Sequence, residues 1–179
     1  MATEISGSTG VNKIQDGTIV NADINASAAI AGTKLTMPTG SVLQVVTGVL
    51  TATTSLNAAS YTTMYGATIT PSSTSSKILV RAMVGGLYMN VGGSNQSNWR
   101  LARGSSGCTG QNTNFHTENG RNATVAGTRS YINMEILDSP NTTSATTYNV
   151  QAHRHNGSGS FQINDTAATS TIILMEIQG

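Results

Sequence analysis

The chain of 179 residues is long enough for one domain with an appendage, and 9% of its residues are charged while 37% are hydrophobic. A formal net charge of +1 supplies no clustered basic surface, which argues against a nucleic-acid partner. The polar positions hold Ser, Thr, Asn and Gly instead of charges, so the composition favours an all-β protein over a disordered one. The start of the sequence lacks the pattern of a secretory leader, and no run approaches the roughly 18 apolar residues of a membrane span. We therefore expect no membrane partner.

Residues 1–40 come first, and their apolar pattern is that of neither an amphipathic helix nor a half-buried strand. Single aliphatic residues recur about every five positions, at Ile14, Ile19, Ile24, Ile30 and Leu35. We expect an extended, non-globular tether in which these side chains touch a symmetry axis or a groove only intermittently. Pro38 favours an extended hinge at the end of this segment. The alternative is a disordered N-terminus with coincidental spacing.

Residues 41–179 alternate β-like runs with turn clusters, and no segment has a convincing helical pattern. We predict about eight strands, over 41–50, 61–70, 77–90, 97–104, 128–137, 145–155, 160–164 and 170–178. Gly85 and Gly86 predict a bulge or bend inside the third of these. The polar stretch 105–127 is too long for a hairpin turn and is expected to be a functional or mobile loop. The predicted fold is an antiparallel two-sheet jelly-roll sandwich.

The predicted strands 77–90 and 170–178 are apolar on both faces. One face can pack on the partner sheet, but the other needs a neighbouring subunit, so we expect an oligomer. The residues assigned to the interface between subunits are Leu79, Met83, Ile173, Met175 and Ile177. The charged residues Arg81, Glu135 and Glu176 lie in apolar strands and are expected to pair across subunits. The alternative is a monomer in which a long loop covers the second face.

Enzymatic chemistry has little support in the sequence. The acidic residues are scattered, whereas glycan hydrolysis needs two carboxylates across a cleft, and there is no nucleophile elbow. We predict no enzymatic activity and no cofactor. His153 and His155 share one face of a strand and could supply six nitrogens to a metal at a three-fold axis; the alternative is exposed polar residues at a strand end. Cys108, the single cysteine, is expected to be a buried or idle thiol.

The loop 105–127 is the expected place of any receptor-binding site, because loops on a rigid sandwich commonly carry binding. The candidate residues in this loop are Asn112, Asn114, Phe115, His116 and Arg121. Trp99 and Tyr131 are expected in the core rather than in a binding site. The nearly uncharged exterior favours neutral host-surface glycans, recognised with weak dependence on salt.

Four stretches carry a family resemblance, namely ITPSSTSSKILV (69–80), WRLARGSS (99–106), LDSPNTTSATTYNVQ (137–151) and STIILMEIQG (170–179). They resemble the C-terminal head domain of bacteriophage tail-fibre and virion structural proteins, whose architecture is similar to the trimeric TNF/C1q-like jelly roll. Residues 1–40 resemble the linker that precedes such heads. The resemblance implies a homotrimer located in the virion and attached to other virion proteins, of the tail or the capsid, through its N-terminal segment.

The expected function is that of a non-enzymatic virion structural protein, a short trimeric fibre or spike whose head projects outward for host-surface adhesion. The sequence has no repeated shaft, which keeps open a capsid decoration protein that stabilises or covers the shell. A polysaccharide depolymerase is disfavoured by the missing acid pair. A cellular lectin is disfavoured by the aromatic content of 4% and by the tether.

Overall fold

The computed structural model describes residues 24, 27, 30, 35–89, 96–108, 116–119, 128–156 and 161–179. The chain divides into two units, Met1–Thr36 and Met37–Gly179, and the described strands belong to the second. The assignment of residues 1–40 to attachment and of 41–179 to the head stays a prediction.

The described strands confirm the all-β prediction. They are β1 (Val42–Leu50), β2 (Thr54–Leu56), β3 (Thr62–Ile69), β4 (Lys77–Met89), β5 (Gln96–Arg103), β6 (Ser106–Gly107), β7 (His116–Asn119), β8 (Thr128–Asp138), β9 (Thr146–Asn156), β10 (Phe161–Ile163) and β11 (Ser170–Ile177). Every predicted strand is present, to within one residue at each end. The prediction of one continuous loop over 105–127 is wrong, because β6 and β7 lie in it and pair with β5. Both strands are short and polar, so their own sequences do not predict them. They form because they pair with the free edge of β5.

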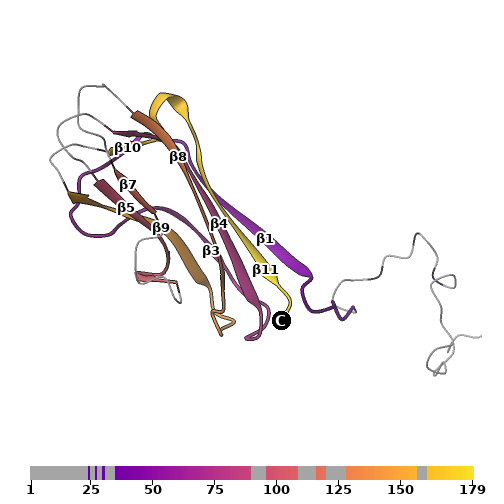
Figure 1. Ribbon diagram of the computed structural model, residues 1–179. Helices are drawn as coiled ribbons and strands as arrows, with labels where there is room; N and C mark the ends of the chain where they lie inside the picture. Colours follow the sequence, from indigo (N-terminus) through magenta and orange to yellow (C-terminus); the bar gives the residue numbers. More distant parts are fainter. Residues whose placement is uncertain are drawn as a thin grey trace, which may run out of the picture. The chain divides into compact units, whose positions relative to one another are not determined.

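Two antiparallel sheets form the sandwich (Figure 1). In sheet A, β1 pairs with β11 and β11 pairs with β4. The end of β4 also pairs with β10, which pairs with β2, while β8 pairs with the other edge of β4. In sheet B the order is β3-β9-β5, and both β6 and β7 pair with the far side of β5. This arrangement confirms a two-sheet antiparallel sandwich and is consistent with a jelly roll.

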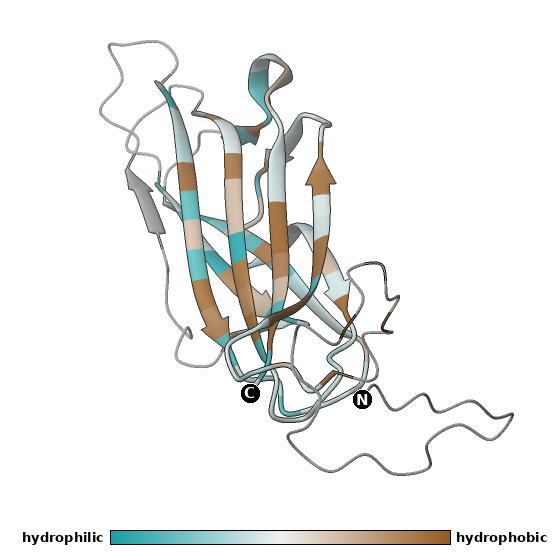
Figure 2. Cartoon of the chain, turned by 90° about the vertical axis from the view of Figure 1, so that its right-hand side faces the viewer, coloured by the Kyte–Doolittle hydropathy of each residue, from teal (hydrophilic) through white to brown (hydrophobic). Residues whose placement is uncertain are grey.

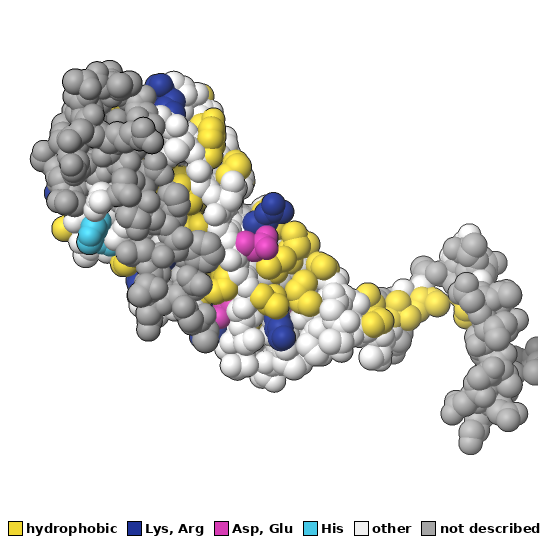
Figure 3. Space-filling model, viewed as in Figure 1, with side chains coloured by type: hydrophobic (Ala, Val, Ile, Leu, Met, Phe, Trp, Pro, Cys, Tyr) yellow, Lys and Arg dark blue, Asp and Glu magenta, His cyan; other side chains and the backbone are white. Residues whose placement is uncertain are grey.

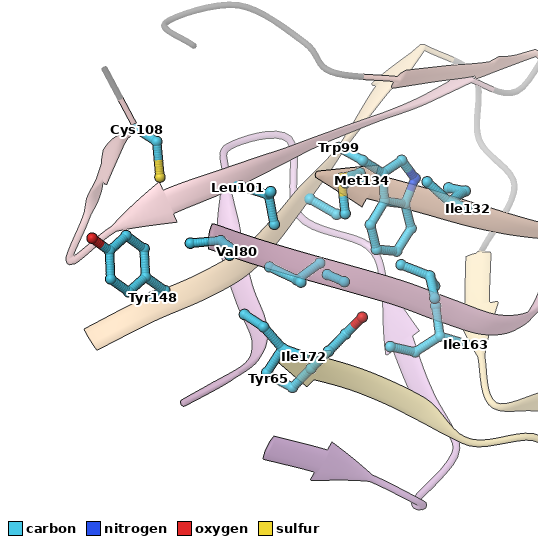
Figure 4. Packing of buried hydrophobic residues seen from close by; sticks show 14 of the residues in the cluster. Tyr65, Val80, Trp99, Leu101, Cys108, Ile132, Met134, Tyr148, Ile163 and Ile172 are labelled. Carbon is cyan, nitrogen blue, oxygen red and sulfur yellow. The ribbon is translucent and has the colours of Figure 1, made fainter. Parts of the chain in front are cut away.

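The core lies between the sheets and is filled by alternate residues of each strand (Figure 4). Trp99 of β5 is fully buried, as predicted, and its indole N–H donates to Oγ of Ser97 at 2.8 Å. The prediction for Tyr131 is wrong, since its side chain is 68% exposed. The reason is the phase of β8: Ile132 and Met134 face the core, so the residues between and before them face out.

The predicted irregularity at Gly85 and Gly86 is confirmed. The register of β4 against β8 shifts between Val84 and Leu87, and Gly86 has a φ of 50°. A side chain on Gly85 would place its Cβ 2.3 Å from the carbonyl oxygen of Thr169, so the loop before β11 packs directly on the bulge.

Asn164, buried in a left-handed conformation, joins this bulge to the end of β1. Its Nδ2 donates to the carbonyls of Leu50 and Ala52 at 2.7 and 3.1 Å, and its Oδ1 accepts from Oγ of Ser170 at 2.7 Å. The same Ser170 oxygen accepts from the backbone N–H of Gly85 at 2.9 Å. This network satisfies polar groups that the bulge would otherwise leave buried and unpaired.

Candidate functional site

The outer face of sheet A is apolar, and we call it the sheet A face. Strand register aligns Val45 of β1 with Met175 of β11, Met175 with Leu79 of β4, and Leu79 with Leu137 of β8. These four residues form one apolar row across the sheet. Val45 is 54% and Leu137 is 52% exposed, while Met175 and Leu79 are half-buried. Figure 2 shows the resulting apolar bands on neighbouring strands.

Two further rows extend the sheet A face. Thr47, Ile173, Arg81 and Glu135 form the next one, and Val49, Thr171, Met83 and Asn133 form the one after it. Between these rows lies a hollow of about 180 Å³, lined by Arg81, Ala82, Met83, Asn133, Thr171 and Ile173. In the space-filling view, hydrophobic side chains gather over this sheet, with one basic and one acidic group side by side at the margin (Figure 3). A large exposed apolar face of this kind indicates an interaction surface.

Every residue predicted for the subunit interface lies on the sheet A face, namely Leu79, Met83, Ile173, Met175 and Ile177. The sequence analysis did not predict that β1 contributes to the sheet A face. In β1, Val45 and Val49 face outward, while Val46 and Leu50 pack against the core. The signal was available, because VLQVVTGVL is apolar on both faces, as strands 77–90 and 170–178 are.

The expected ion pairs between subunits are not needed to satisfy the three strand charges. Arg81 pairs with Glu135 across β4 and β8 of the same chain, with an N–O distance of 3.6 Å, and both side chains are largely exposed. Glu176 faces the interior, where Nε2 of Gln44 and both the N–H and the hydroxyl of Ser72 donate to its carboxylate at 2.6–2.7 Å. The prediction is wrong for Glu176, because its carboxylate is fully buried on partners within the chain. For Arg81 and Glu135, pairing across subunits stays a prediction.

A second buried carboxylate lies where β8 ends. Oδ2 of Asp138 accepts from Nη1 of Arg103 at 2.9 Å and from the hydroxyl of Tyr148 at 2.7 Å. Burial and the neighbouring carboxylate raise the pKa of the Tyr148 hydroxyl, so it stays a donor. Cys108 is buried beside them, as expected, and burial together with Asp138 raises the pKa of its thiol to about 12. A protonated, enclosed thiol of this kind is unreactive.

The predicted histidine pair lies on β9, with the ring centroids of His153 and His155 5.9 Å apart. Nδ1 of His153 lies 3.2 Å from the carbonyl oxygen of Arg154 and therefore donates to it, and Nε2 lies 3.2 Å from the amide nitrogen of Asn98. Both ring nitrogens of His153 are thus engaged within the chain. Among the described residues, no group of three or more potential metal ligands comes together. A metal shared between subunits stays a prediction.

The predicted receptor residues Asn112, Asn114, Phe115 and Arg121 lie outside the described residues. His116 is the first residue of β7 and pairs in register with Trp99 of β5. The assignment of all five residues to a receptor site stays a prediction.

In the N-terminal unit, Ile14 and Ile19 also lie outside the described residues, while Ile24, Ile30 and Leu35 are 41%, 48% and 52% exposed. The role of these aliphatic residues in attachment stays a prediction. Across the part of the chain that the structure describes, there is no helix long and apolar enough to cross a membrane.

No protein-family model and no curated protein matches the chain. Solved structures that are similar in part include two of infectious bursal disease virus. One is described as "Structure of infectious bursal disease virus Gx strain", with 13% identity, a TM-score of 0.34, and coverage of 84% of this chain and 46% of that one. The other is described as "Crystal structure of infectious bursal disease virus VP2 subviral particle", with 11% identity, a TM-score of 0.36, and coverage of 75% and 37%. The chain thus spans less than half the length of either, and we transfer no function from them.

Proposed function

We propose that this chain is a non-enzymatic structural subunit of a bacteriophage virion, a short trimeric fibre or spike whose sandwich projects from the particle for host-surface adhesion. The observation that carries the proposal is the sheet A face, where the row Val45–Met175–Leu79–Leu137 crosses the sheet without interruption by a polar residue. An exposed apolar face of this kind favours association with another surface. In an oligomer, a second copy of the chain can cover the sheet A face.

The size of the effect supports a stable oligomer. Complete burial of one aliphatic side chain contributes about 1.5–3 kcal/mol, and those of the sheet A face are already about half shielded. Covering the remaining half of each contributes roughly 1 kcal/mol per residue, on the order of 10 kcal/mol per subunit over the whole face. This exceeds the lower estimates of the free-energy cost of association, about 4 kcal/mol, and is comparable to the higher ones.

The virion assignment is supported by the family resemblance of residues 69–80, 99–106, 137–151 and 170–179, which the structure places within one sandwich. The N-terminal unit supplies the attachment segment in this proposal, and Ile24, Ile30 and Leu35 are exposed and free to bury against a docking partner or against each other. No cofactor takes part.

Light scattering on the purified protein tests the assembly. We expect about three times the chain mass of 18.5 kDa, and a monomer at micromolar concentration would contradict the proposal. The double variant Val45→Lys with Leu137→Lys places two charges in the apolar row and should dissociate the oligomer. Thr68→Lys, on an exposed position of β3 in the other sheet, is the matched control and should leave the mass unchanged.

Gold labelling of the protein on intact virions tests its location. Label on the tail supports a fibre or spike, whereas label distributed over the shell supports the alternative of capsid decoration. Virions that carry no label would contradict a virion role of either kind.

A further inference from the structure

The outer face of sheet B carries a cluster of aromatic and polar side chains. The guanidinium carbon of Arg100 lies 3.9 Å from the centroid of the Tyr61 ring. The ring of His153 meets the same tyrosine edge to face, with centroids 4.5 Å apart. These residues come from β5, from the position just before β3, and from β9, so three neighbouring strands of the sheet contribute to the cluster. The neighbours of Arg100 in β5 are fully buried, so Arg100 itself points away from the core.

Arg100 is held in one orientation by the protein. Its Nε and Nη2 donate to Oε1 of Gln151 at 3.0 and 2.8 Å, and Nη2 also donates to the carbonyl of Ser105 at 3.1 Å. Gln151 is 5% exposed, and its Nε2 donates in turn to the hydroxyl of Thr63 at 3.3 Å. Because the side chain is already ordered, a ligand that binds it loses little conformational entropy. Nη1 of Arg100 has no hydrogen bond to the described residues.

Among the residues whose side chains the structure describes, none forms an ion pair with Arg100. By contrast, Arg81, Arg103 and Arg129 each lie within 3.6 Å of a carboxylate oxygen. The partners of Arg100 are an amide, a carbonyl and an aromatic ring, all of them neutral. A fixed guanidinium whose Nη1 has no described acceptor, and whose charge has no described counter-charge, is suited to an anionic acceptor such as a carboxylate oxygen.

We propose that Arg100, held against the Tyr61 ring that also packs on His153, binds the carboxylate of an acidic sugar such as a uronic acid. Nη1 of Arg100 donates to the carboxylate. The surrounding face of sheet B presents hydroxyl and amide groups, including Thr63 and Asn149, which suit the hydroxyls of a sugar ring better than an apolar peptide or lipid. The proposal replaces the expected neutral glycan with an acidic one. The expectation of a neutral glycan came from the net charge of the whole chain, which does not describe the local charge at Arg100.

The site rests on the proposed function in one respect, because adhesion gives a virion protein a reason to bind a host glycan. The position of the site is compatible with the proposed assembly, because the outer face of sheet B lies on the opposite side of the sandwich from the sheet A face. Covering sheet A therefore leaves Arg100 accessible.

Calorimetric titration of the full chain with tetragalacturonate tests the site, and the fully methyl-esterified tetramer is the matched probe without charge. We expect the acid form to bind at least about tenfold more tightly than the ester, and its affinity to fall as salt is added. Arg100→Lys keeps the charge but loses the planar fork and the stacking, and should weaken binding about tenfold. Arg100→Gln should abolish the difference between acid and ester.

Arg129→Gln is the control variant, because Arg129 also lies beside a tyrosine, 5.1 Å from the Tyr88 centroid, but is paired with Asp165. It should bind the acid form as the parent chain does. The site is wrong if acid and ester bind equally, if Arg100→Gln binds like the parent, or if the acid form fails to bind at about 10 mM. Light scattering on the same samples separates the two proposals: a monomer that binds the acid contradicts only the assembly, and a trimer that does not bind it contradicts only the site.

Discussion

Replacing Glu176 by Gln keeps the size of the side chain and removes its negative charge. In the parent chain the fully buried carboxylate accepts hydrogen bonds from N and Oγ of Ser72 at 2.7 and 2.6 Å and from Nε2 of Gln44 at 2.6 Å. A Gln side chain must turn its own N–H groups toward at least one of these donors, which then loses its acceptor. Since a hydrogen bond to a charged group contributes about 1.5–3 kcal/mol, we expect Glu176→Gln to lower the free energy of unfolding by about 2–4 kcal/mol.

The loss should depend on pH. Burial raises the pKa of Glu176, but the hydrogen bonds from Ser72 and Gln44 outweigh burial and hold the pKa below its usual value. Because the pKa is lower in the folded chain, the unfolded chain binds the proton first as the pH falls. The stability from Glu176 is therefore complete above the usual carboxyl pKa, near pH 4.5, and is lost as the pH falls through the folded value. The gap between parent and variant should narrow in acid.

Urea unfolding at several pH values, followed by the fluorescence of the single and buried Trp99, measures this gap. Glu135→Gln is the matched control: Glu135 is exposed and lies 3.6 Å from Arg81, so its loss should cost less than about 1 kcal/mol. Equal stability of parent and Glu176→Gln at neutral pH, or a gap that widens as the pH falls, would refute the reasoning.

Three further predictions concern the core. Asn164→Ala leaves the carbonyls of Leu50 and Ala52 without a donor and places Ala at a φ of 57°, so it should lower the free energy of unfolding by about 3 kcal/mol or more, measured by the same urea titration. Gly48→Ala brings a Cβ within 2.4 Å of the Gly66 carbonyl oxygen and should lower the melting temperature by several degrees, which differential scanning fluorimetry measures. Cys108 should react with a thiol reagent at about pH 8 only after unfolding, because burial raises its pKa; rapid labelling of the folded protein would contradict this.

The strands were predictable because each is a run of apolar and β-branched residues that stands between turn clusters. The faces were predictable only in part. In β8 both phases of the alternation contain apolar residues, so the sequence did not reveal that Ile132 and Met134, rather than Tyr131, face the core. The short strands β6 and β7 lack the apolar alternation that would predict them. They form because the edge of β5 has backbone groups that need hydrogen-bond partners.

The cluster on sheet B could not be predicted from spacing. Tyr61, Arg100 and His153 are far apart in the sequence, and they meet only because β9 pairs with β3 on one side and with β5 on the other. Each residue taken alone has an ordinary explanation as an exposed polar or aromatic side chain. Register, which sets the rows across a sheet, is the information that single strands do not contain.

The four stretches that carry the family resemblance supply residues to both buried carboxylate networks. Ser72 from the first stretch donates to Glu176 in the fourth, while Arg103 from the second and Tyr148 from the third both donate to Asp138, which also lies in the third. Ser72, Arg103 and Tyr148 therefore compensate the burial of two carboxylates. The sheet A face and the Arg100 cluster lie on the outer surfaces of the two sheets, where side chains can change without disturbing either buried network. Assembly and recognition should for this reason be tested at outward-facing residues, because variants of Ser72, Arg103 or Tyr148 would report loss of folding.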